Sequence, residues 1–503
     1  MPNTKQLNVI ETQQLVTGDD VGKSVEDLVS LAQRDAEYFQ DMRNETWGAL
    51  QVGSTIGGYH TEIHPINSDH FKDWLGARCF KANGGAIANP TMDRVISALS
   101  ASAKFGANAP REVHLRTATL AGRYYIDLGD PRWRVVEVDA SGWRILDKSP
   151  VMFRRTSTMK ALPDPIAGGS FTSLLPIINV PENSWLLLLP WVIECLRPDT
   201  PYVGLQLSGI QGSAKSFTQS ILRELIDPNV ENLRARPRGR EDLFAGAHQN
   251  LLLSYENLSV LPTDMQDAFC TVLTGGGAGS RKLYSGDQEQ LISVKRPVVL
   301  NGINEVVTNP DLLDRFICLE LNEIKIRKTE SELRAAFQAI HPRVFGAVLK
   351  WFARALALLP AIKNEPLMLP RMGDFALLGE AVLRSTKRKP KLFLRRYDRQ
   401  RSKDVKNVIG ASSFGAAIEA YLGQNPKGIS GNHTEISRAL RAHYASGVGR
   451  DAVINDWPEG GKAFGNAMRR LQPALVKIGI AAKRSGRVRQ GFTWSIRRTS
   501  PNA

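Results

Sequence analysis

The sequence predicts a multidomain α/β protein whose central part, residues 171–330, is built on a parallel sheet. Apolar strand-like runs at 202–209, 250–257 and 296–303 are separated by helical patterns, and this alternation is typical of a parallel sheet. A glycine-containing turn joins the first of these strands to the helix after it, which is where such folds bind phosphate groups. The central region is therefore expected to be a nucleotide-binding α/β core.

The turn itself has P-loop spacing, GIQGSAKS at residues 209–216. Glycines allow backbone N–H groups to surround phosphate oxygens, and the following helix adds positive potential at its N-terminus. Lys215 is placed to reach the β- and γ-phosphates of ATP, and Ser216 to bind Mg²⁺. The residues expected to contact the nucleotide here are Gly209, Gly212, Ser213, Ala214, Lys215, Ser216 and Phe217. The alternative is an ordinary glycine-rich turn.

Ala214 departs from the pattern, because a second glycine usually occupies this position. Alanine is the smallest residue with a Cβ atom, and we expect it to be tolerated if its φ angle stays negative.

An acidic residue at the end of a neighbouring strand is the second requirement of such a site. Glu256 follows the apolar run at 250–255 and is expected to hold Mg²⁺ or to polarise the attacking water. Many motor ATPases carry two acids here, whereas Asn257 follows Glu256 in this chain. Either Glu256 both holds Mg²⁺ and polarises the attacking water, or the general base is another residue. The alternative is that Glu256 has no catalytic role and is simply a solvated residue at the end of a strand.

Two further polar residues follow the next strand. Asn301 ends an apolar run and could orient the attacking water, although Asn-Gly is also a strong turn signal. Arg315 follows a short helix and could stabilise transition-state charge on a neighbouring subunit's nucleotide. A local salt bridge from Arg315 to Asp311 or Asp314 is an equally weighted alternative.

The remaining sequence divides the chain into parts with different patterns. Segments 111–120, 122–129 and 133–146 are predicted to be short antiparallel strands. The expected parts are a polar segment of unknown role (1–70), an α+β accessory domain (71–170), the ATPase core (171–330), a helical lid (331–386), a basic linker (387–409) and a winged-helix-like domain (410–503).

Composition indicates a folded protein with a polyanionic partner. The 503 residues carry a formal net charge of +15, which favours nucleic acid over anionic membrane. The four cysteines form no CxxC pair, and no Cys/His cluster has zinc spacing. The N-terminus lacks a signal-peptide pattern, and the apolar run at 185–193 is too short to span a bilayer. A soluble cytoplasmic protein is expected.

The ordered motifs resemble the helicase-like ATPase of phage and mobile-element primase–helicase proteins, within the AAA+ and superfamily-3 class of hexameric motors. The motifs that carry the resemblance are GIQGSAKS, LLLSYENLS, TGGGAGSRKLYSGDQEQ, RPVVLNGI and NPDLLDRFICLEL, with flanking similarity from about residue 70 to WPEGGKAFGNAMRRL.

The resemblance implies a role for each matching residue. Lys215 and Ser216 would hold ATP and Mg²⁺, and Glu256 would be the Walker B acid. Asn301 would be sensor 1 and Arg315 the arginine finger. Arg371 would begin a lid helix as a second sensor. Such motors act as rings of identical subunits, hexamers in this class, and a separate primase is an expected partner, since residues 1–170 contain no catalytic acid cluster.

Nucleic acid is expected to contact two places. Residues 280–297 are predicted to form a hairpin, which in related motors points into the ring channel; the contact candidates are Arg281, Lys282 and Tyr284. The alternative is a solvated edge hairpin. The C-terminal helices and strand pair resemble a winged helix that binds duplex DNA. Its contact candidates are Arg469, Arg470, Lys483, Arg484, Arg487 and Arg489.

These expectations lead to one leading hypothesis and two rivals. The first is an ATP-dependent DNA helicase or replication motor of a phage or mobile element, acting on single-stranded or forked DNA in the bacterial cytoplasm. The second is a DNA-binding initiator or regulator that uses nucleotide only as an assembly switch. The third is an inactive P-loop scaffold.

Overall fold

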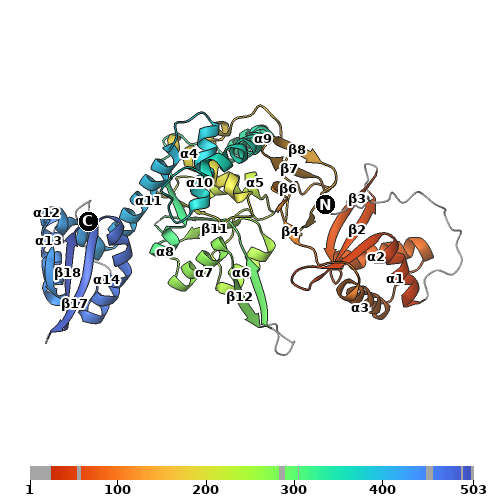
Figure 1. The fold of residues 1–503 in the computed structure, drawn as a ribbon, viewed down its shortest axis with the longest axis horizontal. Helices are drawn as coiled ribbons and strands as arrows, with labels where there is room; N and C mark the ends of the chain where they lie inside the picture. Colours follow the sequence, from red (N-terminus) through yellow and green to blue (C-terminus); the bar gives the residue numbers. More distant parts are fainter. Residues whose placement is uncertain are drawn as a thin grey trace. The chain divides into compact units, whose positions relative to one another are not determined.

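The computed structural model describes residues 24–53, 58–281, 289–303, 305–448, 457–488 and 491–499. The chain forms two compact units. Unit 1 comprises residues 1–114, 131–133 and 148–155, and unit 2 comprises 115–130, 134–147 and 156–503. Figure 1 labels the elements of both.

Unit 1 is an α+β fold that begins well before residue 70. Its antiparallel sheet runs in the order β1, β2, β3, and β9 pairs parallel to β3. Its elements are α1 (Val25–Arg34), β1 (Ala36–Gln40), β2 (Thr46–Gly53), β3 (Tyr59–Pro65), α2 (Asp69–Asn83), α3 (Asn89–Phe105) and β9 (Met152–Arg154). β4 (Val113–Leu115) lies where the chain passes from unit 1 to unit 2.

Hydrophobic packing explains why the expected boundary at residue 70 is wrong. Leu28 of α1, Leu50 of β2, Phe71 of α2 and Leu99 of α3 share one buried cluster. Residues 24–65 and the helices at 69–105 therefore bury each other's apolar faces and cannot be separate parts. Apolar residues in β1 and β2 are adjacent rather than strictly alternating, so neither strand shows a clear period of two.

The predicted strands at 111–146 are present, but they belong with the central region. They form the antiparallel meander β5 (Thr117–Leu120), β6 (Arg123–Asp127), β7 (Val135–Asp139) and β8 (Gly142–Leu146). Tyr124 of β6 packs on Phe352 of helix α9, with ring centroids 4.9 Å apart. Val136 and Val138 of β7 join the same buried cluster. This packing, which sequence periodicity does not reveal, overrides the expected 71–170 domain.

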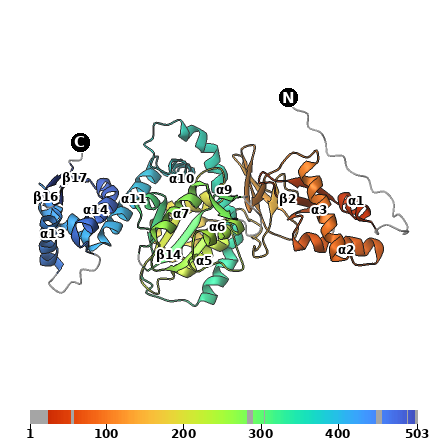
Figure 2. The same cartoon turned by 90° about the horizontal axis from the view of Figure 1, so that it is seen from below.

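The centre of unit 2 is the predicted parallel sheet. Its four strands lie in the order β11, β14, β10, β15, all parallel. They span Leu253–Leu258, Val298–Gly302, Gly204–Ser208 and Phe316–Glu320, respectively. Apolar side chains on both faces are buried, as expected for a sheet covered by helices. Figures 1 and 2 show α5, α6 and α7 gathered around it.

Helices supply the covering layers. The short ones are η1 (Phe171–Leu174), η2 (Glu182–Ser184) and α8 (Pro310–Leu313). The longer ones are α4 (Trp185–Cys195), α5 (Lys215–Ile226), α6 (Arg240–Gln249), α7 (Thr263–Thr274), α9 (Glu330–Lys363) and α10 (Gly373–Ser385). Within the described ranges, α9 alone is long and apolar enough to span a membrane, but 56% of its most apolar window is buried in the protein. We therefore treat α9 as a core helix.

The region expected to be a basic linker is helix α11 (Leu392–Gly410). Phe393, Tyr397, Val405 and Val408 recur at helical spacing and are buried. Phe393 and Tyr397 pack against Phe375 of α10, with ring centroids 5.4 and 5.3 Å from it. The basic residues lie mainly on the other face. The region was predicted to be a linker because of its high charge content, although its apolar residues follow the pattern of an amphipathic helix.

The C-terminal region contains the helices and the strand pair that the sequence predicts, and one additional strand. Strand β18 lies between β16 and β17 in an antiparallel sheet. The elements are α12 (Ser413–Gln424), β16 (Ile429–Asn432), α13 (His433–Val448), α14 (Gly460–Lys477), β17 (Ile480–Val488) and β18 (Gly491–Arg498). The residues Phe464, Met468, Leu471 and Leu475 form the buried face of α14.

Candidate phosphate-binding site

The glycine turn, defined as residues 209–214, connects the carboxyl end of β10 to the first residue of α5. Gly209 has φ +143° and Gly212 has φ +77°, conformations in which side chains are disfavoured. A Cβ atom on Gly209 would lie 3.0 Å from Ser213 Oγ and 3.2 Å from the Leu321 carbonyl oxygen. Both glycines are therefore required by the path of the turn.

Lys215, the first residue of α5, directs its ammonium group back over this turn. Nζ donates hydrogen bonds to the carbonyl oxygens of Gly209 and Ile210, each at 2.8 Å, and lies 3.5 Å from Ser213 Oγ. Partial burial lowers the pKa of Lys215 below its usual value. A cation held over glycine-rich backbone at a helix N-terminus is suited to bind an anion.

Ala214 does not keep the negative φ angle that we expected. Its φ is +61° and its ψ +34°, in the left-handed region, and it is the N-cap residue of α5. An L-residue in this conformation costs about 1–2 kcal/mol relative to a right-handed one. The turn thus imposes the glycine conformation on a residue that has a Cβ atom.

Two residues that sequence reasoning missed surround the turn. Asn179 Nδ2 donates to the Ser213 carbonyl oxygen at 3.0 Å, and its backbone N–H donates to Thr218 Oγ1 at 3.4 Å. The Arg327 guanidinium lies so close that a Cβ atom on Gly212 would be 2.9 Å from it. Neither residue belongs to a sequence motif, because each reaches the turn from a loop distant in the chain.

Ser216 and Phe217 occupy the first turn of α5 and are half-buried. The Arg334 guanidinium lies 5.8 Å from the centre of the Phe217 ring. Arg334 also pairs with Glu224 on α5 at 3.0 Å. These contacts fix the outer face of α5 against α9.

Glu256 lies at the carboxyl end of β11 and is half-buried. Its backbone N–H donates to the Arg234 carbonyl oxygen at 2.9 Å. The next residue, Asn257, is exposed and has φ +55°. The strand order places β14 between β11 and β10, and the carboxyl ends of parallel strands share one sheet edge. Glu256 is therefore on the same edge as the glycine turn.

Asn301, near the carboxyl end of β14, links β11 to α5 through hydrogen bonds. It is buried; its Oδ1 accepts from the Asn257 N–H at 2.9 Å, and its Nδ2 donates to Gln219 Oε1 at 2.7 Å. Gln219 Nε2 donates to Ser254 Oγ at 2.8 Å and to the Tyr255 carbonyl oxygen at 3.1 Å. Since Gln219 lies one helical turn after Lys215, this network holds the end of β11 beside the start of α5.

Arg315 and Arg371 meet at Asp311, away from the glycine turn. Arg315 Nη1 contacts Asp311 Oδ2 at 2.5 Å, and Arg371 pairs with the other carboxylate oxygen. Phe316 is aligned with Gly204 and Glu320 with Ser208. Arg315, one residue before Phe316, thus lies at the amino end of β15, about 17 Å along the strands from the end of β10 at about 3.3 Å per residue. The local salt bridge considered for Arg315 is present.

Contacts around Asp311 affect its charge. Burial tends to raise the pKa of Asp311, but interactions with Cys270, Arg315 and Arg371 outweigh it and the pKa is lowered. The Arg315 side chain is 11% exposed. The Asp311 carboxylate therefore pairs with two guanidinium groups near the amino end of β15, away from the glycine turn.

A hairpin precedes Asn301, but its first strand starts at Gly276, before the predicted range of 280–297, and the residues between its two strands lie outside the described ranges. Strands β12 (Gly276–Arg281) and β13 (Glu289–Val294) pair antiparallel and leave the body of unit 2 near α6 and α7 (Figure 1). Arg281 is the last residue of β12. Lys282 and Tyr284 lie outside the described residues.

Exposed basic side chains follow the outer face of α14. Lys462, Arg469 and Arg470 are exposed, opposite the buried face. Arg469 Nη2 donates to Asn466 Oδ1 at 2.8 Å. Lys483 and Arg484 are exposed on β17, and the Arg484 guanidinium stacks over the Phe492 ring at 3.1 Å.

The backbone of Arg487 belongs to β17, and Arg489 lies outside the described residues. Among the described basic residues, those on α14 and β17 form a positive surface suited to phosphate contact.

Comparison with known families covers much of unit 2. Residues 172–389 match the family described as actinomycete integrative conjugative element replication protein (RepA). Residues 414–502 match the RepA C-terminal domain of the same elements. The chain is thus similar to a replication protein of a mobile element over residues 172–389 and over its C-terminal region, which agrees with the mobile-element part of the sequence resemblance. No curated protein matches the chain significantly.

Solved structures give weaker similarity. "SCCmec type IV Cch - active helicase" has a TM-score of 0.46 at 12% identity, covering 92% of this chain and 93% of that one. "The A form apo structure of NrS-1 C terminal region-CTR" has a TM-score of 0.37 at 13% identity, covering 94% and 98%. Scores below 0.5 at this identity do not establish a shared fold or function.

Proposed function

Because residues 172–389 and 414–502 are similar to a mobile-element replication protein, we propose that the chain is an ATP-driven DNA motor, a replicative helicase. The observation that carries the proposal is Lys215 held over the glycine turn, with Glu256 and Asn301 on the same sheet edge. In this proposal the central region is an α/β P-loop core of the AAA+ or superfamily-3 type. The motor works in the cytoplasm of a bacterial host.

The residues at the turn fit ATP and Mg²⁺. The backbone N–H groups of residues 209–214 and the N-terminus of α5 would surround the phosphates. Lys215 would exchange its two carbonyl partners for phosphate oxygens, which bind an ammonium more strongly because they are charged. Ser216 and Glu256 offer the oxygen ligands that Mg²⁺ prefers. The ion would neutralise charge developing on the transferred phosphoryl group.

The hydrogen bonds of Asn301 support a more specific proposal for this residue than the sequence does. Both ends of its amide are engaged, by Asn257 and Gln219. Asn301 would therefore sense nucleotide by coupling β11 to α5. A γ-phosphate that displaced either partner would move the end of the Walker B strand relative to the nucleotide.

The position of Arg315 supports the further proposal that the chain acts as a ring of identical subunits, a hexamer in this class of motor. Its own glycine turn lies at the opposite sheet edge, so its guanidinium would act on a neighbour's nucleotide. Arg371 shares Asp311 with Arg315, so the second sensor would serve that same neighbouring site. In each subunit, Asp311 would hold both arginines in position until the neighbour's phosphate competes for them.

DNA binding completes the proposal. The C-terminal region would be a winged helix, with α14 and the β17–β18 hairpin contacting duplex phosphates. The β12–β13 hairpin, with Arg281, Lys282 and Tyr284, would contact single-stranded or forked DNA in the ring. A separate primase would supply primers.

The test is ATP hydrolysis and strand displacement on forked DNA, with ATP binding measured by thermal shift. ATP with Mg²⁺ at ~100 times its Kd should add about 2.7 kcal/mol to the free energy of unfolding. Lys215→Ala should abolish ATP hydrolysis, strand displacement and the thermal shift caused by ATP. Lys363→Ala, at an exposed lysine in the last turn of α9, is the matched control and should change none. A Lys215→Ala protein that unwinds DNA normally would refute the motor.

The ring is tested separately by mixing two inactive variants. Lys215→Ala retains the arginine, and Arg315→Ala retains the glycine turn. If Arg315 acts on the neighbouring subunit, mixed rings contain some complete sites and should regain ATPase activity. Mixtures that stay as inactive as the separate variants, although light scattering shows mixed oligomers, would exclude this arrangement.

A second function, a nucleotide-switched DNA-binding initiator, is favoured by one feature of the site. Asn257 rather than a second acid follows Glu256, and its N–H is committed to Asn301. This candidate predicts ATP-dependent protection of a specific duplex sequence, with turnover that DNA does not stimulate. Footprinting alongside the ATPase assay separates the two functions.

A further inference from the structure

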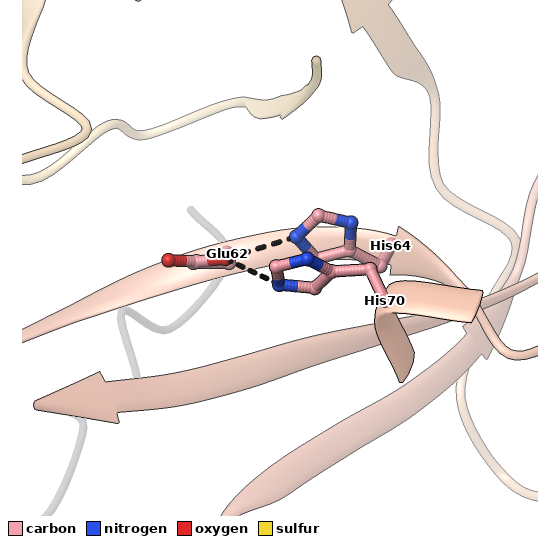
Figure 3. Close-up of side chains that lie close together, drawn as sticks. All are labelled: Glu62, His64 and His70. Atoms are coloured by element: carbon pink, nitrogen blue, oxygen red, sulfur yellow. Dashed lines mark hydrogen bonds and ion pairs between the residues drawn. The ribbon is translucent and has the colours of Figure 1, made fainter. Parts of the chain in front are cut away.

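Strand β3 in unit 1 presents three chelating side chains on one face. His60, Glu62 and His64 alternate along the strand, so they point the same way. Ser68 caps α2, which places His70 in the first turn of that helix. Figure 3 shows Glu62, His64 and His70 converging, two from the strand and one from the helix.

The distances between these groups are short. His64 Nε2 and His70 Nε2 each lie 3.0 Å from Glu62 Oε2. The two imidazole rings stack with centroids 3.8 Å apart. All three ligand atoms lie within 4.8 Å of one another. In tetrahedral coordination with metal–nitrogen bonds of about 2.0–2.1 Å, ligand atoms are separated by about 3.3 Å. The observed spacing therefore needs only small shifts to enclose an ion.

The carboxylate is oriented by a further histidine. His60 Nε2 lies 2.8 Å from Glu62 Oε1, the oxygen that the other two histidines do not contact. Ligating carboxylates in metal sites are commonly held by such outer contacts. Burial tends to raise the pKa of Glu62, but hydrogen bonds from His64 and His60 and the nearby imidazoles lower it to about 2. The second carboxylate oxygen is thus held by His60, which leaves Oε2 directed at His64 and His70.

His64 is largely buried, with Trp133 beside its ring. Burial lowers the pKa of His64 and the hydrogen bond to Glu62 raises it, and the net change is downward. Arg155 stacks over Trp133 at 3.9 Å, and Trp133 meets the His64 ring edge-on at 5.9 Å. The Glu62 and His64 side chains are each 13% exposed, whereas that of His70 is 55% exposed.

We propose that Glu62 Oε2, His64 Nε2 and His70 Nε2 bind one divalent transition-metal ion of the zinc class. Two imidazoles and one carboxylate suit zinc and its neighbours rather than Mg²⁺ or Ca²⁺. His60 is a positioning residue that acts through Glu62. The exposed side chain of His70 gives solvent access to the ion. The ion joins β3 to α2 and stabilises unit 1.

The experiment uses the full-length protein without an affinity tag, stripped with chelator and without nucleotide. Zn²⁺ is titrated by calorimetry, metal content is measured after dialysis, and Co²⁺ is added to detect tetrahedral absorption bands. Wild type should bind one Zn²⁺ per chain and melt at a higher temperature when loaded. His70→Ala and Glu62→Gln should lose stoichiometric binding, and His60→Ala should weaken it ~10–100-fold.

Two controls make the result decisive. His114→Ala removes another histidine of unit 1 and should bind like wild type. Lys215→Ala should also bind one Zn²⁺, which separates this site from the nucleotide site. His70 is half-exposed, so its truncation leaves the fold intact, as circular dichroism will verify. If wild type and His70→Ala retain the same amount of Zn²⁺, or neither retains any, the proposal is overturned.

Discussion

Replacing Ala214 with glycine should stabilise the protein, although glycine usually destabilises helices. Ala214 is held at φ +61° and ψ +34° as the N-cap residue of α5. Glycine has no Cβ atom, so it adopts this conformation without strain. The substitution removes no side-chain hydrogen bond, because Ala214 makes no side-chain cap contact.

The magnitude follows from two opposing contributions. Relief of the left-handed alanine conformation is worth about 1–2 kcal/mol. The greater freedom of glycine in the unfolded chain opposes it by about 0.4–1 kcal/mol. The expected net gain in the free energy of unfolding is therefore about 0.5–1 kcal/mol.

Ala335→Gly is the matched control. Ala335 is exposed within α9 and has ordinary helical geometry, so glycine there should cost about 1 kcal/mol. Urea denaturation should give shifts of opposite sign for the two variants, and ATP binding should be retained in both. A loss of stability in Ala214→Gly equal to that in Ala335→Gly would refute the strain argument.

Three further outcomes follow from the structure. Asp227→Asn should cost about 3–5 kcal/mol in urea unfolding, because Asp227 is buried between Arg116 and Arg223; an unchanged midpoint would contradict it. Burial raises the pKa of Asp404 to about 7, above the ordinary aspartate value of about 3.9. The protonated Asp404 side chain therefore contributes fully to the free energy of unfolding below pH ~4, and this contribution is lost as the pH rises toward 7. Asp404→Asn should flatten that decline, measured as melting temperature against pH. DNA affinity should fall about a thousandfold between 50 and 200 mM salt if ~6 phosphates are contacted, and Arg470→Ala should reduce the slope of log affinity against log salt by ~1; a flat salt response would count against the basic surface.

Local patterns allowed much of the central region to be predicted. The helix at 215–226 and the strands around Leu205, Tyr255 and Val299 are where periodicity and the glycine turn indicate. The placement of Lys215 at the turn follows from spacing alone, since strand, turn and helix are contiguous. The acid and the asparagine share its sheet edge because parallel strands align their carboxyl ends.

Other features depend on residues far apart in the chain. Asn179 and Arg327 reach the glycine turn from separate loops. The Glu62, His64 and His70 cluster lacks recognisable zinc spacing, because its ligands combine a strand of period two with the start of the next helix. The meander at 117–146 joins unit 2 through packing on α9. Each of these contacts is invisible to a window of neighbouring residues.

The sequence by itself determined the strand–turn–helix, its lysine and the positive charge of the chain, because backbone geometry and composition are local properties. The tertiary structure decided the conformation of Ala214, the pairing of Arg315 and Arg371 with Asp311, and the division into units. The physical reason is that a φ angle forced by flanking elements, an ion pair and a shared apolar core depend on which distant segments are packed together. Only the folded chain specifies that packing.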